Sequence, residues 1–407
     1  MTATATVTTL SQESVIEKGF YVPTFQVLVQ NSGLPKDVVR DIQQISYHDN
    51  YKEIDGFELT INNWDATTRS FKYIGSETEK TLNGPRSPYY KLFEPCGKTV
   101  QISMGYLGNL RVMMTGRFIT MEPTFAMSGA STLSVRGLNV LNSLRTKQYT
   151  YSWTNKRDSE IAQSLDNLID PATGKKRVPA RIIVREHPEQ SEPLLEYVSE
   201  ENQYDIDFLL TRARVRGYVL VYNESKKGTQ PTLYFGPSKD AASAVRAVTF
   251  QLDWGKSLLE FKPSLTTHNQ IKSVTVRGWN RQTKKAISAK STVTDAGFRI
   301  NRDIQRLITE CHPREEIVVH EPVFTPQQAQ KRADAILTDR LRSFVKATGT
   351  TVGLPDLRAG VNVQIGGVGS RLSGTYFVTE TTHTIGPKGY TTQFKARRED
   401  FEGGKAS

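Results

Sequence analysis

Residues 97–102 read Gly-Lys-Thr-Val-Gln-Ile, and residues 360–365 read Gly-Val-Asn-Val-Gln-Ile. In both stretches apolar and polar side chains alternate after the glycine, which is the period-two pattern of a half-buried β-strand. Two similar strands far apart in one chain indicate an internal duplication, because repeated sequence is the signature of a repeated structural unit.

Two further pairs of segments occur in the same order. Residues 115–118, Thr-Gly-Arg-Phe, resemble residues 373–376, Ser-Gly-Thr-Tyr, and both lead to a glutamate, Glu122 or Glu380. Upstream, the segment around Trp64 resembles the segment around Trp279. A glycine between strand-like runs permits a turn or a bulge. The turn and strand positions expected to correspond are Trp64 with Trp279, Gly97 with Gly360, and Gly116 with Gly374.

These patterns predict a β-rich α+β fold made of two related antiparallel β-barrels, with closing strands at residues 132–138 and 390–396. An inserted α+β unit separates the barrels, and a helical insertion interrupts the second. The expected boundaries are a leader or neighbour-binding arm at 1–18, a first barrel at 19–150, the α+β unit at 151–240, a second barrel at 241–400 with its insertion at about 281–350, and a flexible tail at 401–407.

Helix signals fall inside these insertions. The spacing predicts one helix over 158–170, ended by Pro171, and another from about 200 to 215, followed by Gly217 and a strand at 218–222. Thr325, Pro326 and Gln328 form the start signal of a longer helix that ends near residue 349. Its apolar stripe packs against its own barrel or against a partner.

Composition gives broad limits. The 407 residues carry 53 Lys and Arg against 42 Asp and Glu, a net charge of +11, but the basic residues are scattered among acidic ones. The charge therefore leaves a solvated or assembly surface and a nucleic-acid site both open. No run of about eighteen apolar residues is present, and the N-terminus lacks a secretory pattern. Two cysteines, Cys96 and Cys311, fit assembly in a reducing bacterial cytoplasm.

The motifs of catalysis and ligand binding are missing. Gly255-Lys256-Ser257 lacks the upstream glycine of a phosphate-binding loop, and the glycines at 366–369 lack dinucleotide spacing. The six histidines show no metal-ligand spacing and are expected in surface or packing roles: His48, His187, His268, His312, His320 and His383. We therefore expect no catalytic residue, cofactor, metal or small-molecule substrate, and no enzyme activity.

Three groups of residues resemble the phage late-control D family of tail hub proteins, which also forms the hub portion of VgrG-type spikes. The first group is residues 23–27 with Asp55-Gly56-Phe57-Glu58-Leu59, and the second is residues 201–209 running to Arg216-Gly217-Tyr218. The third covers residues 353–360, 373–376 and 383–392. Together they span roughly residues 20 to 400 in the family's order.

The resemblance implies a structural baseplate hub of a contractile injection machine, in a phage tail or a related particle. It implies a homotrimer with two barrels per chain, hence a pseudo-sixfold ring that joins the hexameric inner tube to a threefold spike, with baseplate wedge proteins as further partners. VgrG-type chains continue into a needle, whereas this sequence stops at Ser407, so the spike is expected to be a separate protein. The alternatives are a basic nucleic-acid-binding double-barrel protein and a cell-wall-active enzyme with an unrecognised site.

Overall fold

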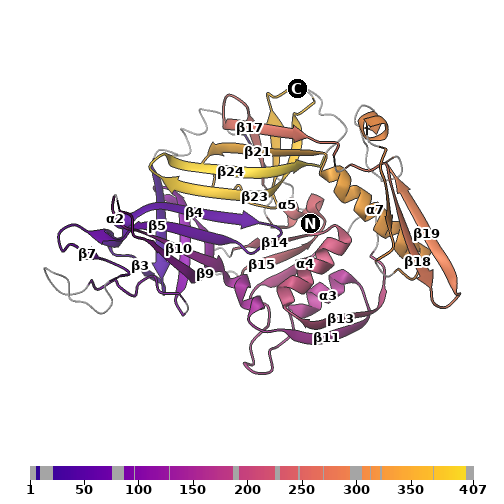
Figure 1. Cartoon of the computed structure of the whole chain (residues 1–407), viewed down its shortest axis with the longest axis horizontal. Helices are drawn as coiled ribbons and strands as arrows, with labels where there is room; N and C mark the ends of the chain where they lie inside the picture. The colour runs from indigo at the N-terminus through magenta and orange to yellow at the C-terminus, as the bar shows by residue number, and fades with distance from the viewer. Residues whose placement is uncertain are drawn as a thin grey trace.

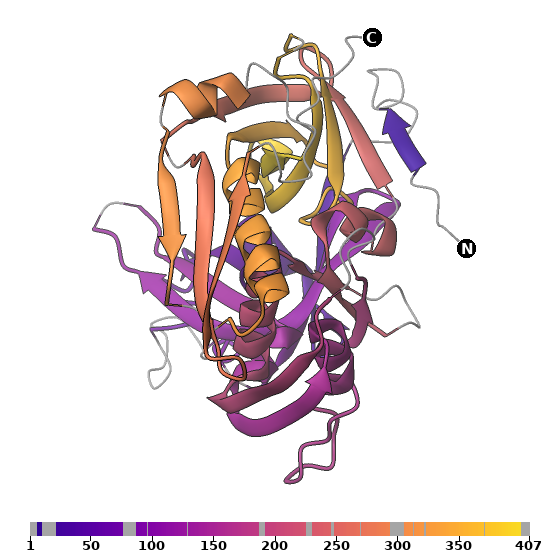
Figure 2. The ribbon, with the colours of Figure 1, turned by 90° about the vertical axis from the view of Figure 1, so that its right-hand side faces the viewer.

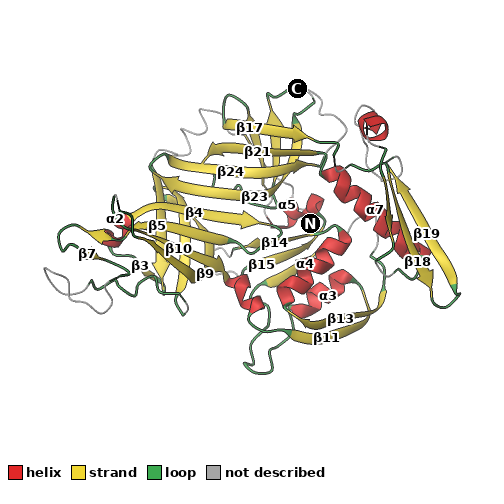
Figure 3. Ribbon diagram, in the orientation of Figure 1, coloured by secondary structure: helices red, strands yellow, loops and turns green. Residues whose placement is uncertain are grey.

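The computed structural model describes residues 6–9, 22–75, 87–95, 97–127, 129–186, 192–224, 230–245, 248–268, 270–293, 305–311, 313–320, 323–369 and 371–399. Nearly half of these residues form strands, and the helices gather mainly in the middle of the chain and in one insertion (Figure 3). Cys96, His187, His312 and the expected tail lie outside the described residues. The described helices include none that is both long and apolar enough to cross a membrane.

One sheet of 14 strands joins strands from both halves of the chain. Its strands from the first half are β1 (Thr6–Thr9), β2 (Pro23–Val29), β3 (Ser32–Gly33), β4 (Ile42–Asn50), β5 (Gly56–Asn62), β8 (Thr99–Tyr106), β9 (Asn109–Thr124) and β10 (Thr132–Asn139). Those from the second half are β16 (Val248–Asp253), β17 (Leu258–Leu265), β21 (Val345–Val352), β22 (Asn362–Gly366), β23 (Gly374–Gly386) and β24 (Gly389–Arg398). Figure 1 shows the two groups side by side, indigo to purple and orange to yellow.

The two groups share one topology over five strands. In space the first runs β4-β5-β10-β9-β8 and the second runs β17-β21-β24-β23-β22. All neighbouring pairs in both runs are antiparallel, and the strands follow each other along the chain in the same order. The match ends at the sixth strand, because β2 pairs antiparallel with β8 whereas β16 pairs parallel with β22. We call these two five-stranded units the first and second repeat.

Two β-bulges fall at the same places in both repeats. On β9 the ladder to β10 skips Ile119, and on β23 the ladder to β24 skips Thr379. On β4 the ladder to β5 skips Gln43, and on β17 the ladder to β21 skips Leu259. Bulges are specific irregularities that families of structures conserve, so two shared bulges align the repeats residue by residue.

This alignment supports one of the predicted correspondences directly. Gly97 and Gly360 stand at equivalent places before β8 and β22, and both adopt left-handed backbone, with φ of +86° and +89°. Gly116 lies opposite Val100, but the residue opposite the equivalent Val363 is Tyr376, so Gly374 is displaced by two positions from the predicted match. Gly116 has its own reason to be glycine, because a Cβ there would approach the Leu138 carbonyl oxygen to 2.0 Å.

The predicted correspondence between Trp64 and Trp279 is wrong. Trp64 begins β6 (Trp64–Asp65), which follows β5 and pairs with β7 (Ser70–Phe71). Trp279 lies on β18 (Ser273–Asn280), in a separate three-stranded sheet inserted between β17 and β21. The counterpart of β5 is therefore β21. A short strand motif with one tryptophan cannot distinguish a repeated strand from an unrelated one, because alternation is common to both.

The insertion in the second repeat is a small α+β layer (Figure 1, right). Its strands β18, β19 (Lys285–Thr292) and β20 (Glu315–Val318) pack with α7 (Pro326–Arg342), and a π-helix, η2 (Leu307–Cys311), precedes β20. Thr325 caps α7 as predicted, since its Oγ1 accepts a hydrogen bond from the N–H of Gln328 at 3.2 Å. Buried Ala333 and Leu337 face the insertion's own sheet, so α7 packs within its own unit.

The unit between the repeats contains the other helices. Its elements are η1 (Val140–Arg145), β11 (Tyr149–Lys156), α3 (Asp158–Leu165), β12 (Arg181–Val184), β13 (Leu195–Gln203), α4 (Asp205–Arg216), β14 (Val219–Asn223), β15 (Thr232–Gly236) and α5 (Ser238–Val245). The predicted helix at 200–215 begins five residues late, because Glu200 continues β13 and bonds to Arg177. The short helix α2 (Lys36–Asp41) precedes β4.

Each repeat has its own apolar core, and the middle unit has a third. Figure 2, turned by 90°, shows the strands of the second repeat standing above those of the first. Among the described strands no ladder closes either repeat into a ring, since the edges continue into β2 and β16 instead. The structure therefore shows a β-rich fold built on a large, mainly antiparallel sheet, and the closed double barrel is not seen.

Candidate functional site

The two repeats meet at one ladder, which we call the in-chain joint. β4 of the first repeat pairs antiparallel with β23 of the second, from Ile45 opposite Ile385 to Asn50 opposite Glu380. β23 accommodates this because it is long: its first residues pair with β22, and its later residues extend past β22 to reach β4. The in-chain joint makes the two repeats one continuous sheet.

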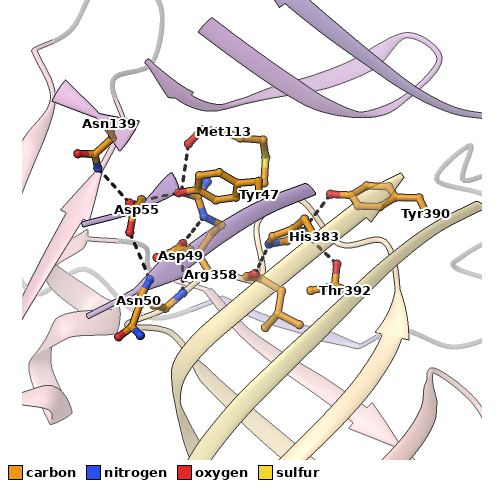
Figure 4. Close-up of polar contacts among 12 residues, drawn as sticks. Tyr47, Asp49, Asn50, Asp55, Met113, Asn139, Arg358, His383, Tyr390 and Thr392 are labelled. Atoms are coloured by element: carbon orange, nitrogen blue, oxygen red, sulfur yellow. Dashed lines mark hydrogen bonds and ion pairs between the residues drawn. The ribbon is translucent and has the colours of Figure 1, made fainter. Parts of the chain in front are cut away.

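A buried arginine crosses this joint (Figure 4). Arg358, in the connection before β22, is 3% exposed and forms an ion pair with Asp49 of β4. Its guanidinium also donates to the hydroxyl of Tyr47 and, at 3.1 Å, to the carbonyl oxygen of Met113 on β9. The N–H of Ala359 donates to the same Asp49 carboxylate at 3.3 Å. One side chain of the second repeat is thus bonded to two strands of the first.

A second buried carboxyl, Asp55, completes this network. It accepts hydrogen bonds from the Tyr47 hydroxyl at 3.2 Å, the Asn139 side-chain amide at 3.3 Å and the Asn50 N–H at 3.2 Å. The pKa of Asp55 is raised to about 8, mainly by burial and then by the negative charge of Asp49, while Arg358 and the hydrogen bonds from Asn50 and Tyr47 oppose the shift. Asp55 is therefore protonated at neutral pH, so the single positive charge of Arg358 is matched by the single negative charge of Asp49.

His383 fixes the other side of the same connection. Its Nε2 donates to the Leu357 carbonyl oxygen at 3.0 Å, so Nδ1 is the acceptor, 3.1 Å from the hydroxyls of both Thr392 and Tyr390. The Tyr106 hydroxyl of the first repeat donates to the Gly353 carbonyl oxygen at 3.0 Å. The connection from residue 353 to 361 is thus held from both repeats.

This arrangement is suited to fastening and offers no reacting centre. Tyr47, Asp49, Asp55, Arg358 and His383 are all buried, and each has partners within the protein. A buried ion pair whose remaining donors and acceptors are satisfied holds a unique geometry, whereas a catalytic group must reach a substrate. In the described part of the chain, no three His, Cys, Asp or Glu side chains gather as metal ligands would.

The residues selected from the sequence do not come together at one place. Trp64 packs edge-on against Phe71 at 5.3 Å, at the far end of the first repeat, while Trp279 is 53% exposed on the insertion sheet. Gly97, Gly116, Gly360 and Gly374 lie at or beside the strands of the repeats. Sequence reasoning missed Arg358 and Asp49 as a pair. The sequence held one indirect signal for this pair. Segments 55–59 and 353–360, which contain or flank residues of the network, both took part in the family resemblance.

Asp55 makes the stability of the joint depend on pH. The unfolded chain releases this proton near pH 4, whereas the folded chain holds it to about pH 8, so unfolding between these values releases a proton. We therefore expect the free energy of unfolding to fall as pH rises from about 4 to about 8. Asp55→Asn, which cannot titrate, should show a shallower decline in urea unfolding at pH 5 and pH 8, and equal slopes would contradict the assignment.

Solved structures with a similar fold include tail proteins and a type VI secretion component. The 43 kDa tail protein of prophage MuSo2 from Shewanella oneidensis superposes with a TM-score of 0.62 at 15% identity, over 92% of this chain and 98% of that one. A tail protein from Neisseria meningitidis gives 0.61 at 14% identity, over 94% and 98%. An E. coli type VI secretion component, described as similar to T4 bacteriophage tail proteins, gives 0.52 at 10% identity, over 90% and 76%.

The fold is thus that of phage tail and secretion-system tail proteins, and the likeness predicted from the sequence is confirmed at that level. The chain belongs to the Alg8 N-terminal domain family, which matches residues 21–386. The matching family is not the late-control D or VgrG family with which the motifs were compared. No curated protein matches the chain in sequence.

Proposed function

We propose that the chain is a structural baseplate hub of a contractile injection machine. Three copies form a pseudo-sixfold ring, which seats a hexameric inner tube on one side and presents threefold symmetry to a spike on the other. Baseplate wedge proteins contact the ring from outside. The protein is made in the bacterial cytoplasm and works in the baseplate of the assembled particle, with no cofactor and no substrate.

The observation that carries this proposal is the pair of matching repeats. Two five-stranded units in one chain share strand order, chain order and two bulges. Three such chains present six similar units around one axis, and a closed ring is the usual outcome of head-to-tail contacts. We take each repeat as one half of a double-barrel hub, in which neighbouring units complete the curvature that a single repeat lacks.

The in-chain joint supports a structural role over an enzymatic one. Its perturbed carboxyl, Asp55, is enclosed and hydrogen-bonded, so it has neither access to a substrate nor a free proton acceptor. Two solved proteins that share the fold are described as tail proteins, which fits a structural role. A ring of this kind needs a rigid connection between the repeats, because each chain supplies two of the six units and must hold them in a fixed orientation.

Light scattering during size-exclusion chromatography tests the proposal. The purified chain, alone or mixed with its spike, is expected to elute at three times its mass of 45.7 kDa. A strictly monomeric mass under both conditions would rule out the hub. The same sample with double-stranded DNA should show no salt-sensitive complex, whereas steep salt-dependent binding would favour a nucleic-acid-binding protein instead.

A further inference from the structure

Neither the outer edge of β17 nor the far part of β9 has a partner strand among the described residues. β17 pairs only with β21, so its outer edge is open. β9 is long: Asn109 to Arg117 pair with β8 along one edge, and the residues after Arg117 continue past β8 with that edge unpaired in the described chain. Open edges invite pairing with another chain, and proteins either cover them or block them.

The bulge alignment shows which strands of the in-chain joint these two edges correspond to. β17 is the counterpart of β4, and β9 is the counterpart of β23. Within the chain, β4 and β23 are the two strands of the in-chain joint. Each chain therefore makes this joint once with its own strands and carries the two corresponding edges, unpaired among the described residues, on β17 and on the part of β9 beyond Arg117.

We propose that the open edge of β17 in one copy lies against the open edge of β9 in the next copy, in the register of the in-chain joint. This inference rests on the proposed ring and identifies the strands at which its chains meet. Three contacts of this kind and three in-chain joints would alternate around the ring.

The register follows from the counterparts. Tyr47 and His383 face each other in the in-chain joint, and their counterparts are Pro263 and Pro123, which would face each other between copies. The pairs on either side become Leu265 opposite Met121 and Phe261 opposite Phe125. Thus three apolar side chains on one edge would meet three on the other, and Phe125 is 57% exposed in the single chain. The corresponding in-chain positions include the polar side chains of Asp49, Thr381 and His383.

The opposite face of the contact is polar and carries charges of both signs. His48 and Thr382 face each other in the in-chain joint and hydrogen-bond at 3.1 Å. Their counterparts are Ser264 and Glu122, which would face each other between copies. Lys262 lies two residues along β17 from Ser264, within reach of the carboxylate of Glu122 as a diagonal neighbour. In the single chain Lys262 pairs with Glu260 at 2.7 Å and Glu122 pairs with Arg136 at 3.5 Å, so this face of the contact would join two ion pairs that are already balanced.

The two prolines make this contact weaker than the in-chain joint. The N–H of Thr266 donates to the carbonyl oxygen of Phe344, so the backbone of Thr266 faces the β21 side. Successive residues of a strand direct their N–H and C=O groups to opposite edges. Pro263 is three positions from Thr266, so its backbone faces the open edge. Pro123 is the counterpart of His383, whose backbone faces the joint. Proline has no N–H, so the pair lacks the two hydrogen bonds expected of a regular ladder. The chain can therefore exist without its neighbours until the ring assembles.

Disulfide trapping tests the contact. Glu122→Cys and Ser264→Cys are introduced together into a chain with Cys96→Ser and Cys311→Ser. Within one chain β9 and β17 are separated by the path β10-β5-β4-β23-β24-β21, which at about 4.8 Å per strand spacing is roughly 34 Å measured along the sheet. A disulfide needs Cα atoms within about 7 Å, and a bond inside one chain would leave the mass on the gel unchanged, so a covalent dimer or trimer reports a bond between copies.

On a non-reducing gel the double-cysteine chain should run as a covalent trimer, with some dimer. Each single-cysteine chain should remain monomeric, and a mixture of the two should give dimer only. A preparation that has trimeric mass but forms no such bond would overturn this contact and leave the hub standing. A monomeric mass throughout would overturn both.

A second pair of variants tests the prolines. Pro123→Val with Pro263→Val restores both missing donors and should tighten association by about tenfold or more, from two hydrogen bonds. Each single variant should gain less than half of this effect on a free-energy scale. Ser264→Val is the matched control, because it adds the same side chain to the same edge without adding an N–H. Unchanged association in the double variant would contradict the register.

Discussion

Arg358→Met is expected to lower the free energy of unfolding by about 3–5 kcal/mol, because it leaves a buried carboxylate without its counter-charge. Asp49 is 3% exposed and forms an ion pair with the guanidinium of Arg358, so its charge is neutralised inside the protein. The Tyr47 hydroxyl and the Met113 carbonyl oxygen would also lose a donor. Methionine keeps most of the length of the side chain, so the loss reports charge and hydrogen bonding more than volume. Urea unfolding at pH 7 measures the effect.

Two variants act as controls for this loss. Arg136→Met removes an arginine that is half exposed and paired with Glu58 and Glu122 at 3.5 Å, so it should change stability by less than about 1 kcal/mol. Asp49→Asn combined with Arg358→Met removes both charges and should recover part of the stability. If Arg358→Met proved as mild as Arg136→Met, the buried ion pair would not be what fastens the repeats.

Phe118→Ala is expected to destabilise the protein by about 3–5 kcal/mol through the cavity it leaves. The ring is fully buried in the first repeat, edge-on to Phe57 at 5.8 Å and to Phe93 at 5.7 Å. The neighbouring Ile119 is the bulge residue and is 42% exposed, so Ile119→Ala should cost less than about 1 kcal/mol. Similar losses from both variants would mean that the bulge does not direct these side chains as described.

The sequence predicted the repeat best where local chemistry determined the backbone. Val100 and Ile102 alternate with polar neighbours as a half-buried strand requires, and Gly97 and Gly360 open the matching strands with left-handed backbone. The start of α7 was equally readable, since a threonine cap and a proline act within one turn. Patterns of this kind need no information about distant parts of the chain.

Long-range partners could not be predicted. Asp49 and Arg358 are far apart in sequence, and a charged residue in a strand or a loop usually faces solvent. The wrong pairing of Trp64 with Trp279 has the same origin, because each tryptophan fits an alternating strand and only the ladders separate β5 from β18. The bulges at Gln43 and Leu259 leave no mark in the sequence, yet they give the correct alignment.

The same limit applies to the strand edges at which copies are proposed to meet. Pro123 and Pro263 read locally as residues that weaken a strand, and only their place in the sheet shows that both face an unpaired edge. The equivalence of these edges to the in-chain joint is a property of topology and not of composition. A duplicated unit therefore indicates where copies meet, even when its two halves have diverged in sequence.

The most direct test of a ring built from two repeats per chain is electron microscopy of the assembled particle viewed along its axis. Class averages are expected to show exact threefold symmetry with six similar lobes around the lumen, three joined within chains and three between them. A ring with three lobes, or six lobes contributed by six chains, would contradict the proposal that each chain supplies two of the six units.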